Sequence, residues 1–116
     1  MNRAEAERRG RRAETIAAWW LRVHGWRIVA RRLRTPVGEV DLVVRRGRTV
    51  AFVEVKTRHN HEDLSLAVDR HRLTRVARAA EALISRFANR GETVRIDVIL
   101  IGSGGLPRHL KNVWHG

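Results

Sequence analysis

The chain has 116 residues, a length that fits one domain over 1–116 and leaves no room for a second. It contains no cysteine, which excludes disulfides and thiolate zinc sites, so any metal must be held by oxygen or imidazole ligands. The 24 Lys and Arg residues outnumber the 12 Asp and Glu residues, and the net charge of +12 favours a polyanionic partner, above all nucleic acid.

The N-terminal third is predicted to form a helix followed by a strand. Residues 4–24 have apolar positions at helical spacing, and Gly25 stands where a left-handed C-cap would end the helix. Residues 26–33 are typical of an edge or early strand, and Thr35-Pro36 with Gly38 soon after signals a turn. The tryptophans of this region are expected to pack in the core, with Trp19 the most exposed of them.

A β-hairpin is predicted next, from two β-rich runs over residues 39–44 and 49–55 that are joined through Arg46-Gly47. A two-residue loop at Arg46-Gly47 would place Asp41 diagonal to Glu54, with Cα atoms roughly 7–8 Å apart. A four-residue loop would place the two acids directly opposite, at about 5 Å. In either register both acids share one face of the hairpin with Lys56, because side chains alternate along a strand.

The second half is predicted to hold a helix and two further strands. Residues 57–63 read as a polar loop, in which the letters of His59-Asn60-His61-Glu62-Asp63 suggest a metal cluster only superficially. Residues 70–89 have one apolar helical face, and residues 93–101 are apolar enough to lie inside the sheet. A last strand is expected over 108–114.

Two acidic patterns indicate the chemistry: Gly38-Glu39-Val40-Asp41 and Glu54-Val55-Lys56. Carboxylates at the ends of adjacent strands cost desolvation energy and repel each other, so they usually persist where a cation or a proton compensates them. The simplest chemistry that fits is phosphodiester hydrolysis with a bound divalent metal.

These motifs carry a family resemblance. Gly38-Glu39-Val40-Asp41-Leu42-Val43, followed by Phe52-Val53-Glu54-Val55-Lys56-Thr57-Arg58, with a glutamate in the preceding helix, resembles the YraN-like family. That family is grouped with the restriction-endonuclease-like PD-(D/E)XK superfamily, which includes archaeal Holliday-junction resolvases. The resemblance spans nearly the whole chain and implies an α/β fold, with a mixed central β-sheet flanked by helices.

The resemblance also implies roles for individual residues. Asp41 matches the acid of the first motif, and Glu54 with Lys56 matches the second, so these three are the candidate catalytic residues. The carboxylates of Asp41 and Glu54, with the backbone carbonyl of Val55, would bind Mg²⁺ or Mn²⁺, and Glu14 matches the helix glutamate that joins the metal shell in resolvase-like members. Lys56 would orient or deprotonate the attacking water and stabilise the transition state.

Arginines are expected to hold the nucleic-acid backbone, since their planar forks suit bidentate phosphate recognition. The candidates are Arg58, Arg70, Arg72 and Arg75. Other members of the family tend to have lysine where this chain has Arg72. The alternative is that these arginines form a solvated helix face, and that the net charge is mostly solvated surface.

Each acid has an alternative reading. Glu54 and Lys56 could instead be a partly exposed ion pair at a strand end, and Asp41 could cap a turn. Glu14 would fit an ordinary salt bridge to an arginine. Glu39, on the face of Asp41, would either support the site or pair with an arginine.

The sequence therefore predicts a nucleic-acid-binding, nuclease-like protein that uses Mg²⁺ or Mn²⁺, with DNA as the expected partner. The rivals are a catalytically inactive nucleic-acid-binding module with the same fold, and a small protein that binds partners through a strand edge. The apolar stretches are too short to cross a bilayer, so we expect a cytoplasmic protein without membrane contact. Symmetric cutting of branched DNA would require a homodimer.

Overall fold

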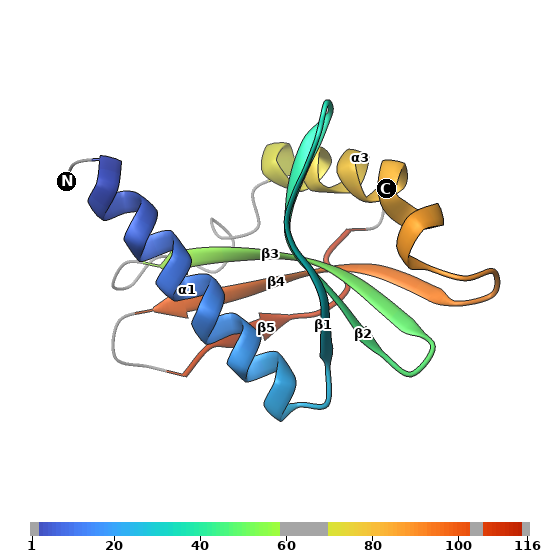
Figure 1. The fold of residues 1–116 in the computed structure, drawn as a ribbon, viewed down its shortest axis with the longest axis horizontal. Coiled ribbons are helices and arrows are strands. Elements are labelled where there is room, and N and C mark those ends of the chain that lie inside the picture. The colour runs from blue at the N-terminus through green and yellow to red at the C-terminus, as the bar shows by residue number, and fades with distance from the viewer. Residues whose placement is uncertain (1–2, 59–69, 103–105, 115–116) are drawn as a thin grey trace.

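A mixed β-sheet forms the centre of the protein and lies between two helices (Figure 1). The computed structural model describes residues 3–58, 70–102 and 106–114, without the side chains of residues 3, 5–7, 9 and 58. Within these residues the helices are α1 (Arg3–Val23) and α3 (Arg70–Phe87). The strands are β1 (Arg27–Thr35), β2 (Gly38–Arg46), β3 (Thr49–Arg58), β4 (Thr93–Gly102) and β5 (Arg108–Leu110).

The strands lie side by side in the order in which they follow in the chain, from β1 to β5. β1, β2 and β3 form an antiparallel meander, β3 and β4 are parallel, and β5 is antiparallel to β4. In the sequence, α3 follows β3 and precedes β4, and it thus forms part of the crossover connection that two parallel strands require. The predicted α/β class is confirmed, as are the edge position of β1 and the internal position of β4.

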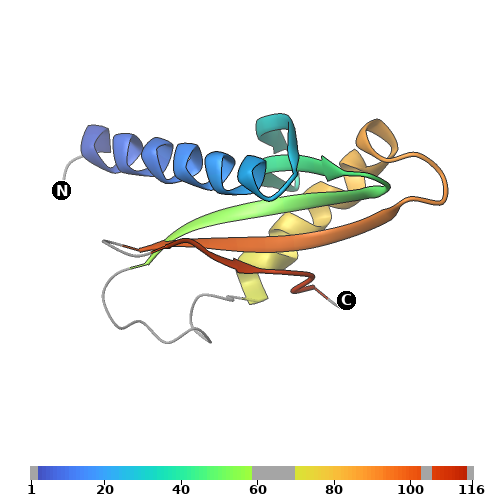
Figure 2. The same cartoon turned by 90° about the horizontal axis from the view of Figure 1, so that it is seen from below.

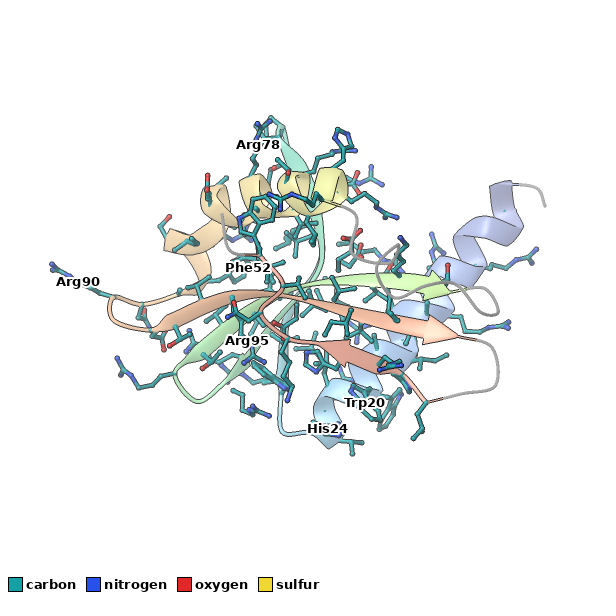
Figure 3. The ribbon with its side chains drawn as sticks, turned by 180° about the vertical axis from the view of Figure 1, so that it is seen from behind. Trp20, His24, Phe52, Arg78, Arg90 and Arg95 are labelled. Carbon is teal, nitrogen blue, oxygen red and sulfur yellow. The ribbon has the colours of Figure 1, made fainter. Side chains whose placement is uncertain are left out.

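The core has one layer on each side of the sheet (Figure 2). Along β3, Ala51 and Val53 pack in the layer of α1, whereas Val50 and Phe52 pack in the layer of α3, because successive side chains alternate. Phe52 lies under α3, where its ring meets the edge of Phe87 at a centroid distance of 6.4 Å (Figure 3). The sheet therefore has an apolar core layer on each of its two faces.

α1 ends at the predicted glycine cap. Gly25 has φ +88°, and its N–H donates to the carbonyl of Arg22 at 3.0 Å, while Trp26 N–H donates to the carbonyl of Leu21 at 2.9 Å. These two bonds form a Schellman motif, which satisfies carbonyls at the helix end. Trp19 is 63% exposed, as predicted.

The β2–β3 loop differs from the predicted one by one residue. Gly47 and Arg48 form the loop, because Arg46 pairs with Thr49, and Gly47 has φ +59°. A two-residue loop with glycine first has the positive φ that a type II′ turn requires there, which fixes the loop at this position. Continued one residue beyond its last pair, Leu42 and Val53, this register makes Asp41 level with Glu54, a placement that the sequence led us to expect only for a longer loop.

The C-terminal strand is shorter than predicted. β5 covers only Arg108–Leu110, since Asn112 has φ +52° and its N–H donates to Asp97 Oδ1 at 2.9 Å instead of continuing a ladder. The predicted loop after Lys56 begins later, because Thr57 and Arg58 still belong to β3. The suggested cluster over residues 59–63 lies outside the described residues. Neither described helix carries an apolar stretch long enough to span a membrane.

Candidate functional site

The candidate site lies where β2 and β3 separate. Their backbone pairing ends with Leu42 and Val53, and the N–H of Val55 then donates to Asp41 Oδ2 at 2.7 Å. Val40 packs in the α3 layer and Leu42 in the α1 layer, so Asp41 lies at the point where β2 passes between the two layers. The Asp41 carboxylate is therefore accessible from both sides of the sheet.

Asp41 is held in an environment that disfavours its charge. Burial, together with the negative charges of Glu54 and Glu14, raises its pKa from the ordinary 3.8 to about 6. The hydrogen bond from Val55 N–H and the positive charge of Arg72 act in the opposite direction. A cation beside Asp41 would relieve the repulsion and favour the charged carboxylate.

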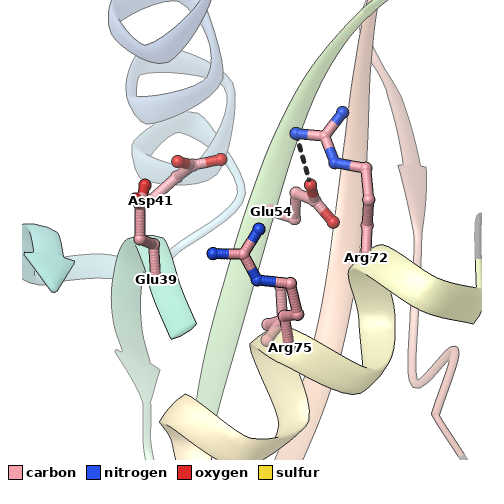
Figure 4. Close-up of a pocket in the computed structure, with 6 residues that line it drawn as sticks. Glu39, Asp41, Glu54, Arg72 and Arg75 are labelled. Carbon is pink, nitrogen blue, oxygen red and sulfur yellow. Dashed lines mark ion pairs between the residues drawn. The ribbon is translucent and has the colours of Figure 1, made fainter. Parts of the chain in front are cut away.

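Glu54 faces Asp41 from β3 and is only 8% exposed. Arg72 of α3 forms an ion pair with it, with Nη2 of the arginine 2.9 Å from Oε1 of the glutamate (Figure 4). Because α3 begins at Arg70, its first turn places Arg72 over the end of the opened strand pair. A buried carboxylate here is thus compensated by positive charge from another element.

Three pockets meet at Asp41, and two of them are also lined by residues of β3. The first is bounded by β2, β3 and α3, and Figure 4 shows its charged residues facing one another. Its lining consists of Glu39, Asp41, Glu54, Arg72, Arg75 and Val76. The second extends toward α1; Asp41 and Arg72 line it as well, together with Glu14, Val55 and Lys56 among others. The three candidate catalytic residues and the candidate ligands are therefore gathered around one carboxylate.

Glu14 of α1 is paired with an arginine, which was the alternative to a metal role. Arg32 Nε donates to Glu14 Oε1 at 2.9 Å. Arg32 has φ +49°, a left-handed conformation that is uncommon for a residue other than glycine and that costs backbone energy. The ion pair ties α1 to β1 beside the site.

The distance between α3 and β2 is set by Gly38. A Cβ atom built on Gly38 would stand 2.2 Å from the backbone carbonyl oxygen of Arg75, far inside van der Waals contact. Only glycine allows this close approach, which places Arg75 beside Glu39 and Asp41 in the first pocket. The glycine of the first motif is thus a packing requirement of the site.

We expect Gly38→Ala to destabilise the protein by about 1–3 kcal/mol, because α3 must move away from β2 to admit the methyl group. The free energy of unfolding in urea measures the loss. Gly10→Ala is the matched control, since nothing lies within 4 Å of a Cβ at that helical position. That change should stabilise α1 by up to about 1 kcal/mol. Equal stability of wild type and Gly38→Ala would contradict the packing role.

Three further predicted site residues differ in how close they lie to the pockets. Lys56 is half-buried and lines the second pocket. Arg70 is exposed at the start of α3 and does not line either pocket. Arg58 ends β3, but its side chain lies outside the described residues.

Comparison with known proteins decides the family. The profile described as "Uncharacterised protein family UPF0102" matches residues 13–101, which include every candidate catalytic residue. The chain belongs to the UPF0102 family. The UPF0102 protein of Sphingopyxis alaskensis is 66% identical over 114 residues, covering 98% of both chains. That of Rhizorhabdus wittichii is 61% identical, covering 98% of this chain and 97% of the relative.

A solved structure shows the same fold. Archaeoglobus fulgidus Hjc, a Holliday junction resolvase from an archaeal hyperthermophile, superimposes with a TM-score of 0.61 over 86% of this chain and 73% of Hjc. The sequence identity is 18%, so the likeness concerns the fold. The UPF0102 chain therefore has the restriction-endonuclease-like fold that the motifs led us to expect.

The donor atoms of the candidate site in this UPF0102 chain are carboxylate oxygens. Among the described residues, no group of three or more His, Asp and Glu side chains is arranged to hold a metal ion. Mg²⁺, however, is commonly held by one or two carboxylates, with waters and substrate oxygens as the other ligands. The opposed carboxylates of Asp41 and Glu54, with Asp41 destabilised by its neighbours, fit that requirement in donor type and charge.

Sequence reasoning missed two features of the UPF0102 site. Arg32 is one of several arginines in its strand, and nothing in the sequence indicates its left-handed backbone or its bond to Glu14. The contact between Gly38 and the backbone of Arg75 was also missed. The glycine preceding Glu39 was read only as a turn signal, although its place in the motif could have indicated a close backbone approach.

Proposed function

We propose that this UPF0102 protein binds nucleic acid, with DNA as the partner, and hydrolyses phosphodiester bonds with Mg²⁺ or Mn²⁺. The observation that carries the proposal is that Asp41 and Glu54 line one pocket just beyond the last pair of β2 and β3, Leu42 and Val53. The net charge of +12 and the fold shared with a Holliday junction resolvase support the same substrate class.

The residues of the site would have separate roles in binding the ion and in hydrolysis. Asp41 and Glu54 would hold the ion through their carboxylates, with the carbonyl of Val55 and the Glu14 carboxylate as further oxygen donors. A bound Mg²⁺ or Mn²⁺ supplies water activation and neutralises the charge that develops on the phosphate. Lys56 would orient the attacking water and donate hydrogen bonds to the phosphate oxygens as they gain charge.

Substrate contacts would come from the arginines around the pockets, with Arg72 and Arg75 at the site, Arg70 beside it on α3, and Arg58 at the end of β3. Residues 1–116 would act as one domain in the cytoplasm, without membrane contact. A homodimer would be needed only for symmetric cutting of a branched substrate, since two sites are then required.

The test is a panel of linear duplex, single-stranded and branched DNA and of RNA, incubated with Mg²⁺, Mn²⁺ or EDTA. We expect wild type to cut at least one substrate with Mg²⁺ or Mn²⁺ and not with EDTA. Glu54→Gln should lose cleavage by about 10²-fold or more, because the opposed carboxylate pair is broken.

Glu81→Gln is the matched control, because it removes the same charge from an exposed position on α3 outside both pockets. Its cleavage should equal that of wild type. Cleavage that is the same in wild type and Glu54→Gln would remove the catalytic proposal. Tight binding without cleavage of any substrate would favour the inactive nucleic-acid-binding module instead.

A further inference from the structure

Arg72 stands between the buried acids of the candidate site and the solvent. Its guanidinium contacts Glu54 Oε1 at 2.9 Å, and its side chain is 53% exposed, compared with 10% for that of Glu54. Arg72 also lines two of the three pockets that meet at Asp41. An approaching anion would therefore meet Arg72 before it reached either carboxylate.

The ion pair places Arg72 in competition with any cation that uses Glu54. A divalent ion held by Asp41 and Glu54 would lie close to the guanidinium, and the two positive charges would repel each other across a partly buried site. Arginine has several N–H donors in a planar fork, so an exposed guanidinium can exchange a carboxylate for a phosphate and donate two hydrogen bonds to it.

The second arginine–glutamate pair of the site is built differently. Arg32 donates from Nε to Glu14 Oε1 at 2.9 Å, and Glu14 belongs to α1 rather than to the opposed strand pair. Arg72 reaches Glu54 through a long, exposed side chain from the first turn of α3 and can leave by rotation of that side chain. Of the two arginines, Arg72 is the one paired with Glu54, so it is the one that a cation at Glu54 would displace.

We propose that Arg72 is a built-in counter-ion of Glu54, that a divalent cation displaces it, and that the released guanidinium then binds the substrate phosphate. This inference rests on the proposed function and adds to it a coupling between cation and substrate. Because coupling free energies are reciprocal, the cation strengthens nucleic-acid binding by the factor by which nucleic acid strengthens cation binding.

The first experiment measures the affinity for Mn²⁺ alone by titration calorimetry, in wild type, Arg72→Gln and Arg78→Gln. Arg78 is the matched control, because it lies on the same helix and points away from the sheet (Figure 3). We expect Arg72→Gln to bind Mn²⁺ roughly five- to tenfold more tightly than wild type, and Arg78→Gln to bind it as wild type does. Thermal unfolding of each variant checks that it is folded.

The second experiment measures the transfer to phosphate, with Lys56→Ala present throughout to prevent cleavage. The affinity for a fluorescent DNA duplex is determined with and without Mn²⁺ for Lys56→Ala, Lys56→Ala/Arg72→Gln and Lys56→Ala/Arg78→Gln. Mn²⁺ should strengthen binding roughly three- to tenfold in the first and third proteins, and not in the second.

The outcomes separate this inference from the proposed function. Equal Mn²⁺ affinity in wild type and Arg72→Gln, or an equal effect of Mn²⁺ on DNA binding with and without Arg72, overturns the counter-ion role and leaves the proposed function intact. Absence of Mn²⁺ binding in wild type, Arg72→Gln and Arg78→Gln alike overturns both the counter-ion role and the proposed function, because no cation site is then present. Tighter Mn²⁺ binding confined to Arg72→Gln supports the inference.

Discussion

Replacement of Asp41 by asparagine is expected to abolish cleavage and, at the same time, to stabilise the fold at neutral pH. The carboxylate is buried beside Glu54 and Glu14, and its pKa is raised to about 6. Relative to the ordinary value of 3.8, this corresponds to a cost of up to about 3 kcal/mol when the group is ionised. Asparagine removes the charge and keeps an oxygen that can accept the hydrogen bond from Val55 N–H.

The pH dependence fixes the sign of this effect. Because the pKa of Asp41 is higher in the folded state, the folded protein takes up the proton first, so the contribution of Asp41 to stability is greatest below 3.8 and is lost as pH rises through about 6. The gain in Asp41→Asn should therefore be largest above pH 6 and vanish below about pH 4.

Urea unfolding of wild type and Asp41→Asn at pH 4, 5, 6, 7 and 8 measures the difference, and a cleavage assay at pH 7 measures the loss of activity. Cleavage should fall by about 10²-fold or more. Glu81→Gln, which removes an exposed carboxylate, should change neither quantity. A variant that is less stable than wild type at pH 7 would show that Asp41 supports the fold and would remove the argument that its charge is kept for function.

Asp97→Asn is expected to cost about 3–5 kcal/mol of stability, because it removes one partner of a buried ionic cluster. Asp97 is fully buried in β4 and accepts hydrogen bonds from Arg95 at 3.1 Å and from the backbone N–H of Asn112 at 2.9 Å. His109 Nε2 lies 2.7 Å from the second carboxylate oxygen. Asparagine would leave Arg95 and His109 without an anion in the core.

The pH profile of stability tests the same cluster. The hydrogen bonds from His109, Asn112 and Arg95 hold the pKa of Asp97 below its usual range, against the effect of burial. Its contribution is therefore present above the ordinary pKa of an aspartate and is lost as pH falls through the lower folded value. Chemical unfolding of wild type, Asp97→Asn and the exposed-site variant Glu81→Gln gives the energies at pH 7, and its repetition at successively lower pH gives the profile. A loss below about 1 kcal/mol would mean that the cluster does not secure the C-terminal segment.

The elements of the fold could be predicted because their signals are local. Ala13, Ala17 and Leu21 mark one face of α1 by spacing alone, and Gly25 marks its end through a conformation that glycine adopts readily. The exact turn between β2 and β3 was missed by one residue, because the choice depends on which neighbour of Gly47 pairs across the strands. The short β5 was missed because the Asp97 side chain, distant in sequence, takes the N–H of Asn112.

The candidate site was predictable only in part. The proximity of Asp41 and Glu54 could be predicted from strand alternation, because a two-residue loop and a four-residue loop both place them on one face of the hairpin. The arginines that surround them could not be assigned in this way. The left-handed backbone of Arg32 and the position of Arg72 over Glu54 depend on tertiary packing, which no short motif encodes.

Crystals of the wild type grown with Mn²⁺, and measured for anomalous scattering of manganese, would test whether Asp41 and Glu54 form a single cation site. We expect one manganese peak within coordination distance of both carboxylates, and no such peak in crystals of Asp41→Asn. A peak that contacts neither carboxylate, or no peak at saturating Mn²⁺, would contradict a metal-dependent hydrolase and leave a basic nucleic-acid-binding protein.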